Sequence, residues 1–252
     1  ETAAEHLQDL LLKSTRDSVA DVEKVAVAFS GGLDSSVVAA LAKKCKVEVQ
    51  LISVGLNRQA EIEHAEASAE SLGLPLKLQT YSVEDVERVL PKVLWLIEEP
   101  DAMKTGVAIP IFWTAETAAR IGCLVLLAGQ GADELFGGYH RYLTEYARGG
   151  AKAAQNAIHR DAMMSYETNF QRDDPVCAFH KVELRLPFAD REVVRFALSL
   201  PLELKIASSE DALRKRILRR LAQDMGIPAS IANRTKKAVQ FATGVDKALR
   251  KL

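Results

Sequence analysis

Two apolar runs in the first half of the chain each end in a glycine-rich turn that carries an acidic residue. The first reads VAVAFSGGLDSS, with Asp34 after its glycines, and the second reads LVLLAGQGADELFGG, with Asp133. Each run has the composition of a buried β-strand, and the residues after each turn have helical composition. A strand that leads directly into a helix is the repeating unit of a parallel sheet, so these two stretches favour an α/β fold.

Two further strand-like runs, at residues 47–55 and 75–81, lie between these stretches and alternate with helical patterns. One of those patterns ends at Gly73, where a helix prefers a residue in the left-handed conformation. An amphipathic helix is predicted over residues 3–20, before the first strand. The alternation predicts a doubly wound, mostly parallel sheet with helices on both faces.

The strand pattern ends near residue 138, and the segments that follow look helical almost throughout. We therefore predict two parts, an α/β unit over residues 1–138 and a helical part over residues 139–252 that packs against it. The helical part is interrupted at Gly149-Gly150, at Pro175 and around LRLPFADR. It is a candidate for binding or covering the second substrate.

The bulk composition excludes several classes of protein. The 252 residues carry a formal net charge of -1, so no global charge points to nucleic acid or to a charged membrane surface. The three cysteines lack the spacing of a zinc site or disulfide framework, which favours a reducing compartment. No apolar run approaches the roughly 20 residues that span a bilayer. We expect a soluble, cytoplasmic protein; Glu1 follows no Met, so the natural start can have been trimmed.

The first turn has the features of a phosphate site. Gly31 and Gly32 let the backbone approach an anion closely, and the helix that follows opens with unpaired N–H groups. Asp34 would repel a bare phosphate, but a Mg²⁺ ion between the carboxylate and the phosphate oxygens removes that conflict. Hydroxyl groups are offered by Ser30, Ser35 and Ser36. The alternative is an ordinary strand-to-helix turn with a Ser or Asp cap.

No lysine follows these glycines, and the spacing is not G-x-G-x-x-G, so two common nucleotide loops are excluded. SGGLDSS resembles instead the pyrophosphate loop of the ATP pyrophosphatase (PP-loop) superfamily. This resemblance implies cleavage of ATP between its α- and β-phosphates, adenylation of a substrate and release of pyrophosphate. It says nothing about the substrate.

The second turn selects one family within that superfamily. LLAGQGADELFGGYHRY resembles the signature of the asparagine synthetase C-terminal domain, a family shared with β-lactam synthetases. QRDDPVCAFH, KVELRLPFAD and RTKKAVQFATGV, in this order along the chain, resemble further segments of the same family in the same order. The resemblance covers roughly Val25 to Val245.

The resemblance implies a role for each matching residue. The β- and γ-phosphates would be held by Ser30, Gly31, Gly32, Asp34, Ser35 and Ser36. Adenosine would be lined by Phe29, Val54 and the backbone of Ala128 and Gly129. Asp34 and Asp133 would share Mg²⁺, and Lys236 or Lys237 would neutralise charge on the reacting phosphorus, since metal and ammonium charges stabilise such transition states. ATP and Mg²⁺ are thus the expected cofactors.

Several of these residues have structural alternatives. Asp133 could cap a helix, and the two lysines could be a solvated pair. Glu183, Arg185 and Asp190 are interpreted as a scaffold ion-pair network. In SSEDALRKRILRRLA the leucines and isoleucine at positions 213, 217, 218 and 221 share one face of the predicted helix. The basic side chains at 214, 215, 219 and 220 are therefore predicted to point largely outward. We interpret them as a solvated face and not as an RNA site.

The chain departs from the family pattern in three ways. Gln130 stands where the family usually has Glu, so this side chain can exchange hydrogen bonds but cannot take a proton. The glutaminase domain of common asparagine synthetases does not precede this sequence, so free ammonia, a separate glutaminase chain or a trimmed start are the open alternatives. Ala189 replaces a leucine and removes apolar volume near Asp190.

We therefore predict an ATP-dependent amide-forming ligase that adenylates a carboxylate, with aspartate preferred, and then amidates it with ammonia or another amine. The hypothesis for Gln130 is that adenylation is intact and nitrogen transfer is altered. A lactam or amide synthetase for a different carboxylate, a tRNA-modifying enzyme and a non-catalytic nucleotide-binding homologue are the alternatives. The expected partners are ATP and small carboxylate and amine substrates, with no nucleic acid and no membrane.

Overall fold

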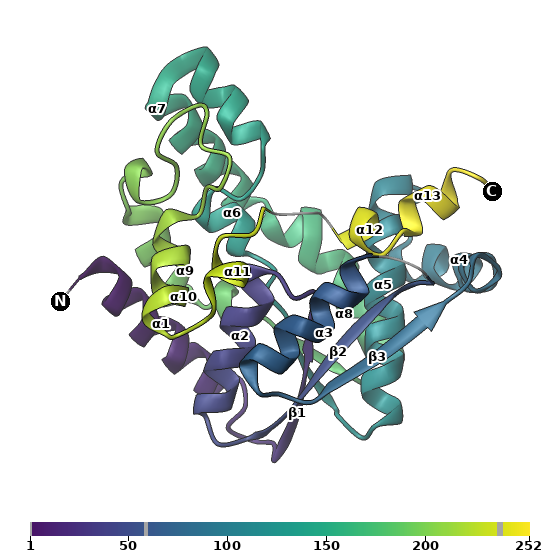
Figure 1. Ribbon diagram of the computed structural model, residues 1–252. Helices are drawn as coiled ribbons and strands as arrows, with labels where there is room; N and C mark the ends of the chain where they lie inside the picture. Colours follow the sequence, from purple (N-terminus) through teal and green to yellow (C-terminus); the bar gives the residue numbers. More distant parts are fainter. Residues whose placement is uncertain (1, 58–59, 236–238) are drawn as a thin grey trace.

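One parallel sheet of five strands organises the computed structural model, which describes residues 2–57, 60–235 and 239–252 (Figure 1). The strand order is β3-β2-β1-β4-β5, and every neighbouring pair is parallel. The strands are β1 (Lys24–Ala28), β2 (Glu48–Leu56), β3 (Leu76–Tyr81), β4 (Val125–Leu127) and β5 (Glu183–Arg185). The predicted α/β class with a doubly wound parallel sheet is confirmed.

Helices make up most of the remaining chain. The first half contains α1 (Ala3–Asp17), α2 (Leu33–Lys44), α3 (Ala60–Leu72), α4 (Val83–Ile97), α5 (Ala102–Arg120) and α6 (Ala132–Phe136). The second half contains α7 (Arg141–Met163), the π-helix η1 (Tyr166–Phe170), α8 (Gln171–Phe179), the 3₁₀ turns η2 (Pro187–Ala189) and η3 (Leu202–Leu204), α9 (Arg191–Ser199), α10 (Arg216–Asp224), α11 (Ala229–Ala232), α12 (Val239–Ala242) and α13 (Val245–Leu249). Among the helices of the described residues, none combines the length and the apolar character needed to cross a bilayer.

The alternating side chains of the central strands define two apolar layers. In β1, Val25 and Val27 join a core with α1, α2, α3, α9 and α10, whereas Ala26 joins a second core with α4, α5, α8 and α13. Because successive residues of a strand point to opposite faces, a sheet with apolar residues at every position must be covered on both sides. The near-continuous apolar run of β1 therefore accounts for the three-layer architecture.

The strand order changes direction between β1 and β4. From β1 the chain proceeds to β2 and β3 on one side, and it then returns to place β4 and β5 on the other side. Ala26 pairs with Leu126 and Val27 with Leu127, so the two strands end at the same edge. Ligands of open α/β sheets bind in the crevice beyond the carboxyl ends at such a reversal. Both glycine-rich turns lie at this point.

The fifth strand was not predicted from the sequence. β5 has only three residues and lies in the part of the chain that was expected to be helical. Arg185 bonds to Glu183 at 2.8 Å and to Asp21, which ties the loop after α1 to the sheet edge, so an ion pair at this place is confirmed. Asp190 does not join it; its Oδ1 accepts from the N–H groups of Glu192 and Val193 as the cap of α9.

Helix α7 rises away from the sheet in Figure 1 and carries a small apolar core of its own. The helix is kinked where Gly149 and Gly150 leave helical geometry, as the sequence indicated. The core of this arm consists of Tyr142, Leu143, Ala154, Ala157, Ile158, Leu202 and Ile206. The arm stands above the crevice at the end of β4, because α6 and Tyr139 connect the second turn directly to α7.

A buried lysine in this region leads to a stability prediction. Lys205 is fully buried, its Nζ has no hydrogen-bond partner among the described residues, and burial lowers its pKa from 10.5 to about 8. The folded chain thus binds fewer protons than the unfolded chain between those values, so stability should rise with pH there and be lowest below pH 8. Lys205→Met should therefore stabilise the protein at neutral pH by up to about 3 kcal/mol, or roughly 5–10 °C in Tm.

Thermal unfolding at neutral and at alkaline pH measures this effect. The gain should shrink at alkaline pH, and the exposed control Lys77→Met should change neither value. A Lys205→Met protein that melts below the unmodified protein at neutral pH would show that the ammonium is paired and not merely desolvated.

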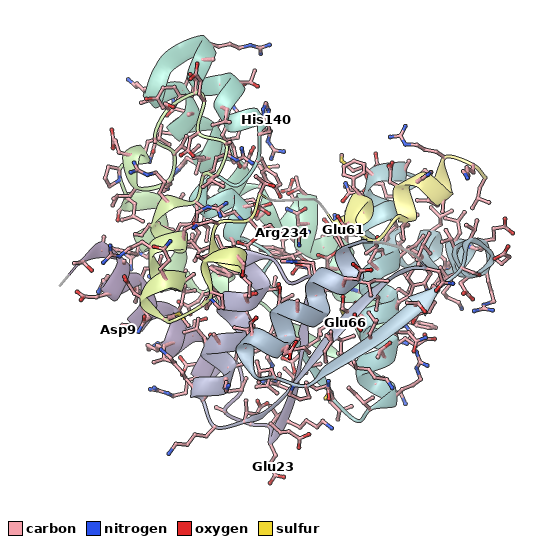
Figure 2. All side chains as sticks on the ribbon, viewed as in Figure 1. Asp9, Glu23, Glu61, Glu66, His140 and Arg234 are labelled. Carbon is pink, nitrogen blue, oxygen red and sulfur yellow. The ribbon has the colours of Figure 1, made fainter. Side chains whose placement is uncertain are left out.

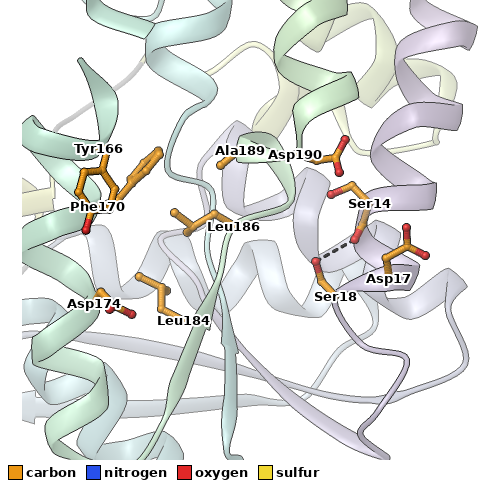
Figure 3. A pocket seen from close by; sticks show the side chains of 10 residues that line it. All are labelled: Ser14, Asp17, Ser18, Tyr166, Phe170, Asp174, Leu184, Leu186, Ala189 and Asp190. Carbon is orange, nitrogen blue, oxygen red and sulfur yellow. Dashed lines mark hydrogen bonds between the residues drawn. The ribbon is translucent and has the colours of Figure 1, made fainter. Parts of the chain in front are cut away.

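A second hollow of about 540 Å³ lies outside the crevice, between α1, η1, α8 and η2 (Figure 3). Tyr166 and Phe170 of η1 face Ala189 and Leu186 across it. Ala189, where a leucine was expected, therefore borders open space at the surface. The walls also carry Ser14, Asp17, Ser18, Asp174, Leu184 and Asp190.

Candidate active site

A cleft of about 580 Å³ opens at the carboxyl ends of β1, β2 and β4, where the strand order reverses. Residues of both glycine-rich turns line it, together with residues of α5, α7, α10 and α12. Glu61 and Arg234, which Figure 2 labels between the α7 arm and the C-terminal helices, also border this cleft. The position is the one that the sequence predicted for a nucleotide.

The first turn is held open by a glycine in the left-handed region. Gly31 has φ = 70°, and a Cβ atom there would lie 2.9 Å from Cδ2 of His64. The carbonyl oxygen of Gly31 accepts from Nε2–H of His64 at 2.8 Å and from the hydroxyl of Ser68 at 3.4 Å. These bonds from α3 fix the Gly31 peptide just before the start of α2.

The serines of the turn are partly used within it. The Ser35 hydroxyl donates to the carbonyl of Gly32 at 3.2 Å and lies 3.3 Å from the hydroxyl of Ser30. The N–H of Gly32 donates to the Ser30 hydroxyl at 3.3 Å. Ser36 is fully buried, and its hydroxyl has no hydrogen-bond partner among the described residues. Ser30, Gly32 and Ser35 border the cleft, whereas Gly31 and Ser36 lie behind it.

The two turns touch each other. A Cβ atom on Gly129 would lie 2.9 Å from Cβ of Asp34 and 3.2 Å from its carbonyl carbon. Only glycine permits this approach, because two backbones cannot move apart without opening the site. The contact brings the carboxylates of Asp34 and Asp133 to the same point of the cleft.

A lysine that the sequence analysis placed elsewhere lies between these carboxylates. Nζ of Lys215 is 2.7 Å and 2.6 Å from the two oxygens of Asp34 and 2.7 Å from Oδ1 of Asp133. The lysine side chain is almost fully buried. Asp133 lies in the first turn of α6, but the N-cap of this helix is Gly131 and not Asp133. The carboxylate of Asp133 is part of the ion pair with Lys215.

The prediction of an outward-facing basic surface at 214–220 is therefore wrong for three of its four residues. Arg214, Lys215 and Arg219 are buried, and only Arg220 is exposed, paired with Asp224 at 2.9 Å. The helix begins later than the apolar pattern suggested, at Arg216. Arg214 and Lys215 lie before it in a turn that directs their side chains inward, and Arg219 is buried from within the helix itself.

The backbone of this turn is unusual. Arg214 and Lys215 have φ = 51° and φ = 50°, a conformation that non-glycine residues seldom adopt. Arg219 Nε donates to the carbonyl of Arg214 at 2.7 Å, and Arg214 Nε donates to the carbonyl of Gly138 at 3.2 Å. Strained residues held by surrounding contacts gather at functional sites, which indicates a role for Lys215 beyond packing.

The ion pair shows that this point of the cleft is built to hold a cation. Burial alone would lower the pKa of Lys215, but the carboxylates of Asp133 and Asp34 hold it above its usual 10.5. The ammonium balances one of the two negative charges of these carboxylates, which leaves one negative charge for a further cation. Carboxylate oxygens, completed by phosphate and water, are the ligands that Mg²⁺ takes in proteins, so Asp34 and Asp133 fit the ion that the sequence implied.

The residues expected around adenosine lie on the other side of the first turn. Phe29 and Val54 border the cleft beside an apolar wall formed by Ile62, Met103, Val107, Pro110 and Ile111. Ala128 is buried beneath the cleft surface, and Gly129 borders it. This apolar pocket suits a flat heterocycle, and the polar groups around Asp34 suit a triphosphate.

The opposite end of the cleft is polar and carries both charge signs. The buried carboxylate of Glu134 accepts from Tyr139 Oη–H and from Nδ2 of Asn169 at 2.8 Å. The Arg141 guanidinium lies 4.2 Å from the centroid of the Tyr139 ring. Arg172 lines the same end. A ligand with one ammonium and one carboxylate group would find complementary charges there.

Gln130 lies at the boundary between the triphosphate end and this polar end. Its Nε2 donates to Oδ2 of Asp173 at 3.2 Å. Lys236 and Lys237 lie outside the described residues, so their predicted role stays a prediction; Thr235 and Val239, which flank the gap, both border the cleft. From the sequence, the role of Lys215 could have been found only by asking which cation balances the charges of Asp34 and Asp133.

The sheet order, the two turns and the paired aspartates define a PP-loop protein of the adenine nucleotide α-hydrolase-like fold. A model of the family described as asparagine synthase matches residues 6–152 and 145–252. The chain belongs to the asparagine synthase family.

Individual relatives agree with this assignment. A putative glutamine-hydrolysing asparagine synthetase of Methanocaldococcus jannaschii is 36% identical over 281 aligned positions, which cover 100% of this chain and 52% of that protein. An asparagine synthetase of Arabidopsis thaliana is 28% identical over 87% of this chain and 39% of its own length. The chain thus spans about half the length of the curated relatives it matches, or less.

A solved structure shows the same fold. The NMN synthetase of Francisella tularensis superposes with a TM-score of 0.54 at 12% identity and covers 95% of this chain and 78% of its own. At that identity the likeness concerns the fold alone.

Proposed function

We propose that this chain is an AMP-forming carbon–nitrogen ligase that uses ATP to activate a carboxylate and then joins the acyl group to ammonia or another amine. The observation that carries the proposal is the convergence of Asp34, Asp133 and Lys215 at the switch point of the sheet. A binding protein needs no such concentration of charge opposite a phosphate turn. An enzyme that releases pyrophosphate does need charged groups near the leaving group, because they stabilise the transition state.

The first step is attack of a carboxylate oxygen on the α-phosphorus of ATP. The bond between that phosphorus and the oxygen bridging to the β-phosphate breaks, and pyrophosphate leaves with the bonding electron pair. The first turn would bind the β- and γ-phosphates, and the Lys215 ammonium would balance the charge that builds up on the leaving group. Mg²⁺ held by Asp34 and Asp133 would supply further positive charge to the triphosphate oxygens when bound.

The carboxylate is proposed to belong to an amino acid, with aspartate first among the candidates. The polar end of the cleft offers Glu134 for an α-ammonium group. Its arginines, Arg172 and Arg141, are already paired with Asp173 and Asp161, so an α-carboxylate would bind to their remaining N–H groups. The relatives carry the name asparagine synthetase, which supports the same substrate. Their names also include glutamine hydrolysis, so glutamine supplied through a partner is the alternative nitrogen source to free ammonia.

Nucleotide product analysis tests the proposal. Purified protein is incubated with ATP, Mg²⁺ and each of a panel of amino acids, with and without ammonium, and the nucleotides are separated by chromatography. We expect AMP and pyrophosphate only when the right carboxylate is present, and asparagine when that carboxylate is aspartate and ammonium is added. ADP as the product would rule out attack at the α-phosphorus.

A further inference from the structure

Gln130 is held by a carboxylate on the helix that walls the polar end of the cleft. Asp173, in α8, is fully buried and accepts from Nε2 of Gln130 at 3.2 Å. The neighbouring Arg172 donates to both oxygens of Asp173, from Nε at 2.7 Å and from Nη2 at 3.0 Å. Burial raises the pKa of Asp173, and the Arg172 charge and the Gln130 amide partly offset this.

This contact fixes the orientation of the Gln130 amide. If the amide were rotated by half a turn, its carbonyl oxygen would face a carboxylate oxygen with no proton between them. The NH₂ group must therefore face Asp173, and the carbonyl oxygen Oε1 is left as the acceptor of this side chain. Gln130 borders the cleft, and within the described part of the chain its side chain makes no other hydrogen bond.

The same contact explains why an acid would be unfavourable at position 130. A glutamate there would place a second carboxylate beside the buried one of Asp173. Two carboxylates at hydrogen-bond distance in a buried site cannot both stay ionised, because like charges and burial both oppose ionisation. One guanidinium, that of Arg172, would then face two acids. An amide avoids this conflict and still offers an oxygen to the cleft.

We propose that the buried carboxylate of Asp173 requires an amide side chain at position 130. Oε1 of Gln130 then positions the nitrogen nucleophile by accepting a hydrogen bond from one of its N–H groups. This inference rests on the proposed function and deepens it. Gln130 binds the amine in its neutral form, because an amide neither attracts an ammonium ion nor takes a proton at neutral pH. The nitrogen attacks the acyl carbon, the bond from that carbon to the AMP oxygen breaks, and the released proton passes to water.

A swap of the acid and the amide tests this assignment. The variants are Gln130→Glu, Asp173→Asn and the double variant that exchanges the two groups and keeps the total charge. Asp174→Asn is the matched control, because Asp174 follows Asp173 directly but lines the separate hollow in Figure 3. Thermal unfolding of each protein shows whether it is folded before any rate is compared.

Two readouts separate the steps of the reaction. Carboxylate-dependent exchange of labelled pyrophosphate into ATP measures adenylation without an amine. Amide formation at varied amine concentration gives kcat and the KM for the amine. Gln130→Glu should lower kcat/KM for the amine about tenfold more than it lowers exchange, which equals about 1.4 kcal/mol, and mostly through KM. The double variant should recover most of that loss, and Asp174→Asn should match the unmodified protein.

Two results would overturn the inference. One is a Gln130→Glu protein with unchanged kinetics for the amine, and the other is a double variant no better than Gln130→Glu alone. Asp173→Asn can fail to fold because Arg172 is left unpaired. The double variant still tests the inference in that case, since it retains an acid beside Arg172. Absence of exchange in the unmodified protein would instead overturn the proposed adenylation on which the inference rests.

Discussion

Replacing Lys215 with Met should lower the rate of carboxylate-dependent AMP formation by about 10²–10³-fold, the range seen when one charge-stabilising group is removed from a transition state. Lys215 contacts both aspartates at 2.6–2.7 Å and is nearly buried, so its charge acts where water screens little. Methionine keeps the length and apolar stem of the side chain and removes only the ammonium. The loss should appear in kcat more than in the KM for ATP.

The same substitution should also affect stability, and the two effects must be separated. Removing the cation leaves two partly exposed carboxylates facing each other at the cleft wall, so the cost should stay below the roughly 3–5 kcal/mol of a fully buried pair. Lys215→Arg keeps the positive charge, so it should restore more of the lost stability than of the lost rate of AMP formation. Lys24→Met is the control, since Lys24 pairs with Glu48 at 3.2 Å at the opposite end of β1. Undiminished AMP formation by Lys215→Met would show that the lysine only fills space.

Gly138→Ala is expected to be the second severe substitution, with AMP formation reduced by at least about 10²-fold. A Cβ atom on Gly138 would lie 1.8 Å from Oδ1 of Asp133 and 2.3 Å from Cε of Lys215. Its φ lies outside the left-handed region, so alanine is compatible with the backbone and only the ion pair must move. Displacement of catalytic groups by about 1 Å is enough for such a loss.

Gly122→Ala provides the contrasting control for Gly138→Ala. Gly122 has φ = 76°, and a Cβ atom there would have no atom within 4 Å, so alanine strains the backbone without touching the site. It should cost about 1–2 kcal/mol of stability and leave AMP formation unchanged. Steady-state rates and thermal unfolding of both variants test the pair. If Gly138→Ala keeps full activity, the positions of Asp133 and Lys215 do not matter for the reaction.

The sequence predicted the parts of this molecule that local patterns encode. The two turns, the first four strands and the left-handed Gly73 (φ = 60°) are in place, because apolar runs and glycines act over a few residues. The position of both turns at one edge also followed, since parallel strands end together. The convergence of Asp34 and Asp133 was implied by the family resemblance and not by the spacing.

The features that the sequence did not predict depend on distant partners. β5 has three residues, and only its pairing with β4 makes it a strand. Lys215 and Asp34 are 181 positions apart, and the periodicity around Lys215 resembled a solvated helix face. Leu213, which matched that periodicity, is exposed and precedes the helix. A left-handed pair of non-glycine residues leaves no local sequence signal, because tertiary contacts stabilise it.

The contact between Gln130 and Asp173 belongs to the same class of feature. The sequence showed that an amide replaces an expected acid at position 130, but its reason lies on another helix, where Asp173 is buried beside Arg172. A substitution of this kind can be interpreted only with its neighbour in view. It is therefore best tested by exchanging both residues together.

Isotope transfer tests the central claim most directly. Aspartate labelled with a heavy oxygen isotope in its side-chain carboxylate is converted in the presence of ATP, Mg²⁺ and ammonium, and the AMP is analysed by mass spectrometry. If the carboxylate attacks the α-phosphorus and the acyl–oxygen bond breaks in the second step, each AMP molecule carries one labelled oxygen atom. AMP without label, formed at the same rate, would mean that water and not the carboxylate attacks ATP, and would contradict the account.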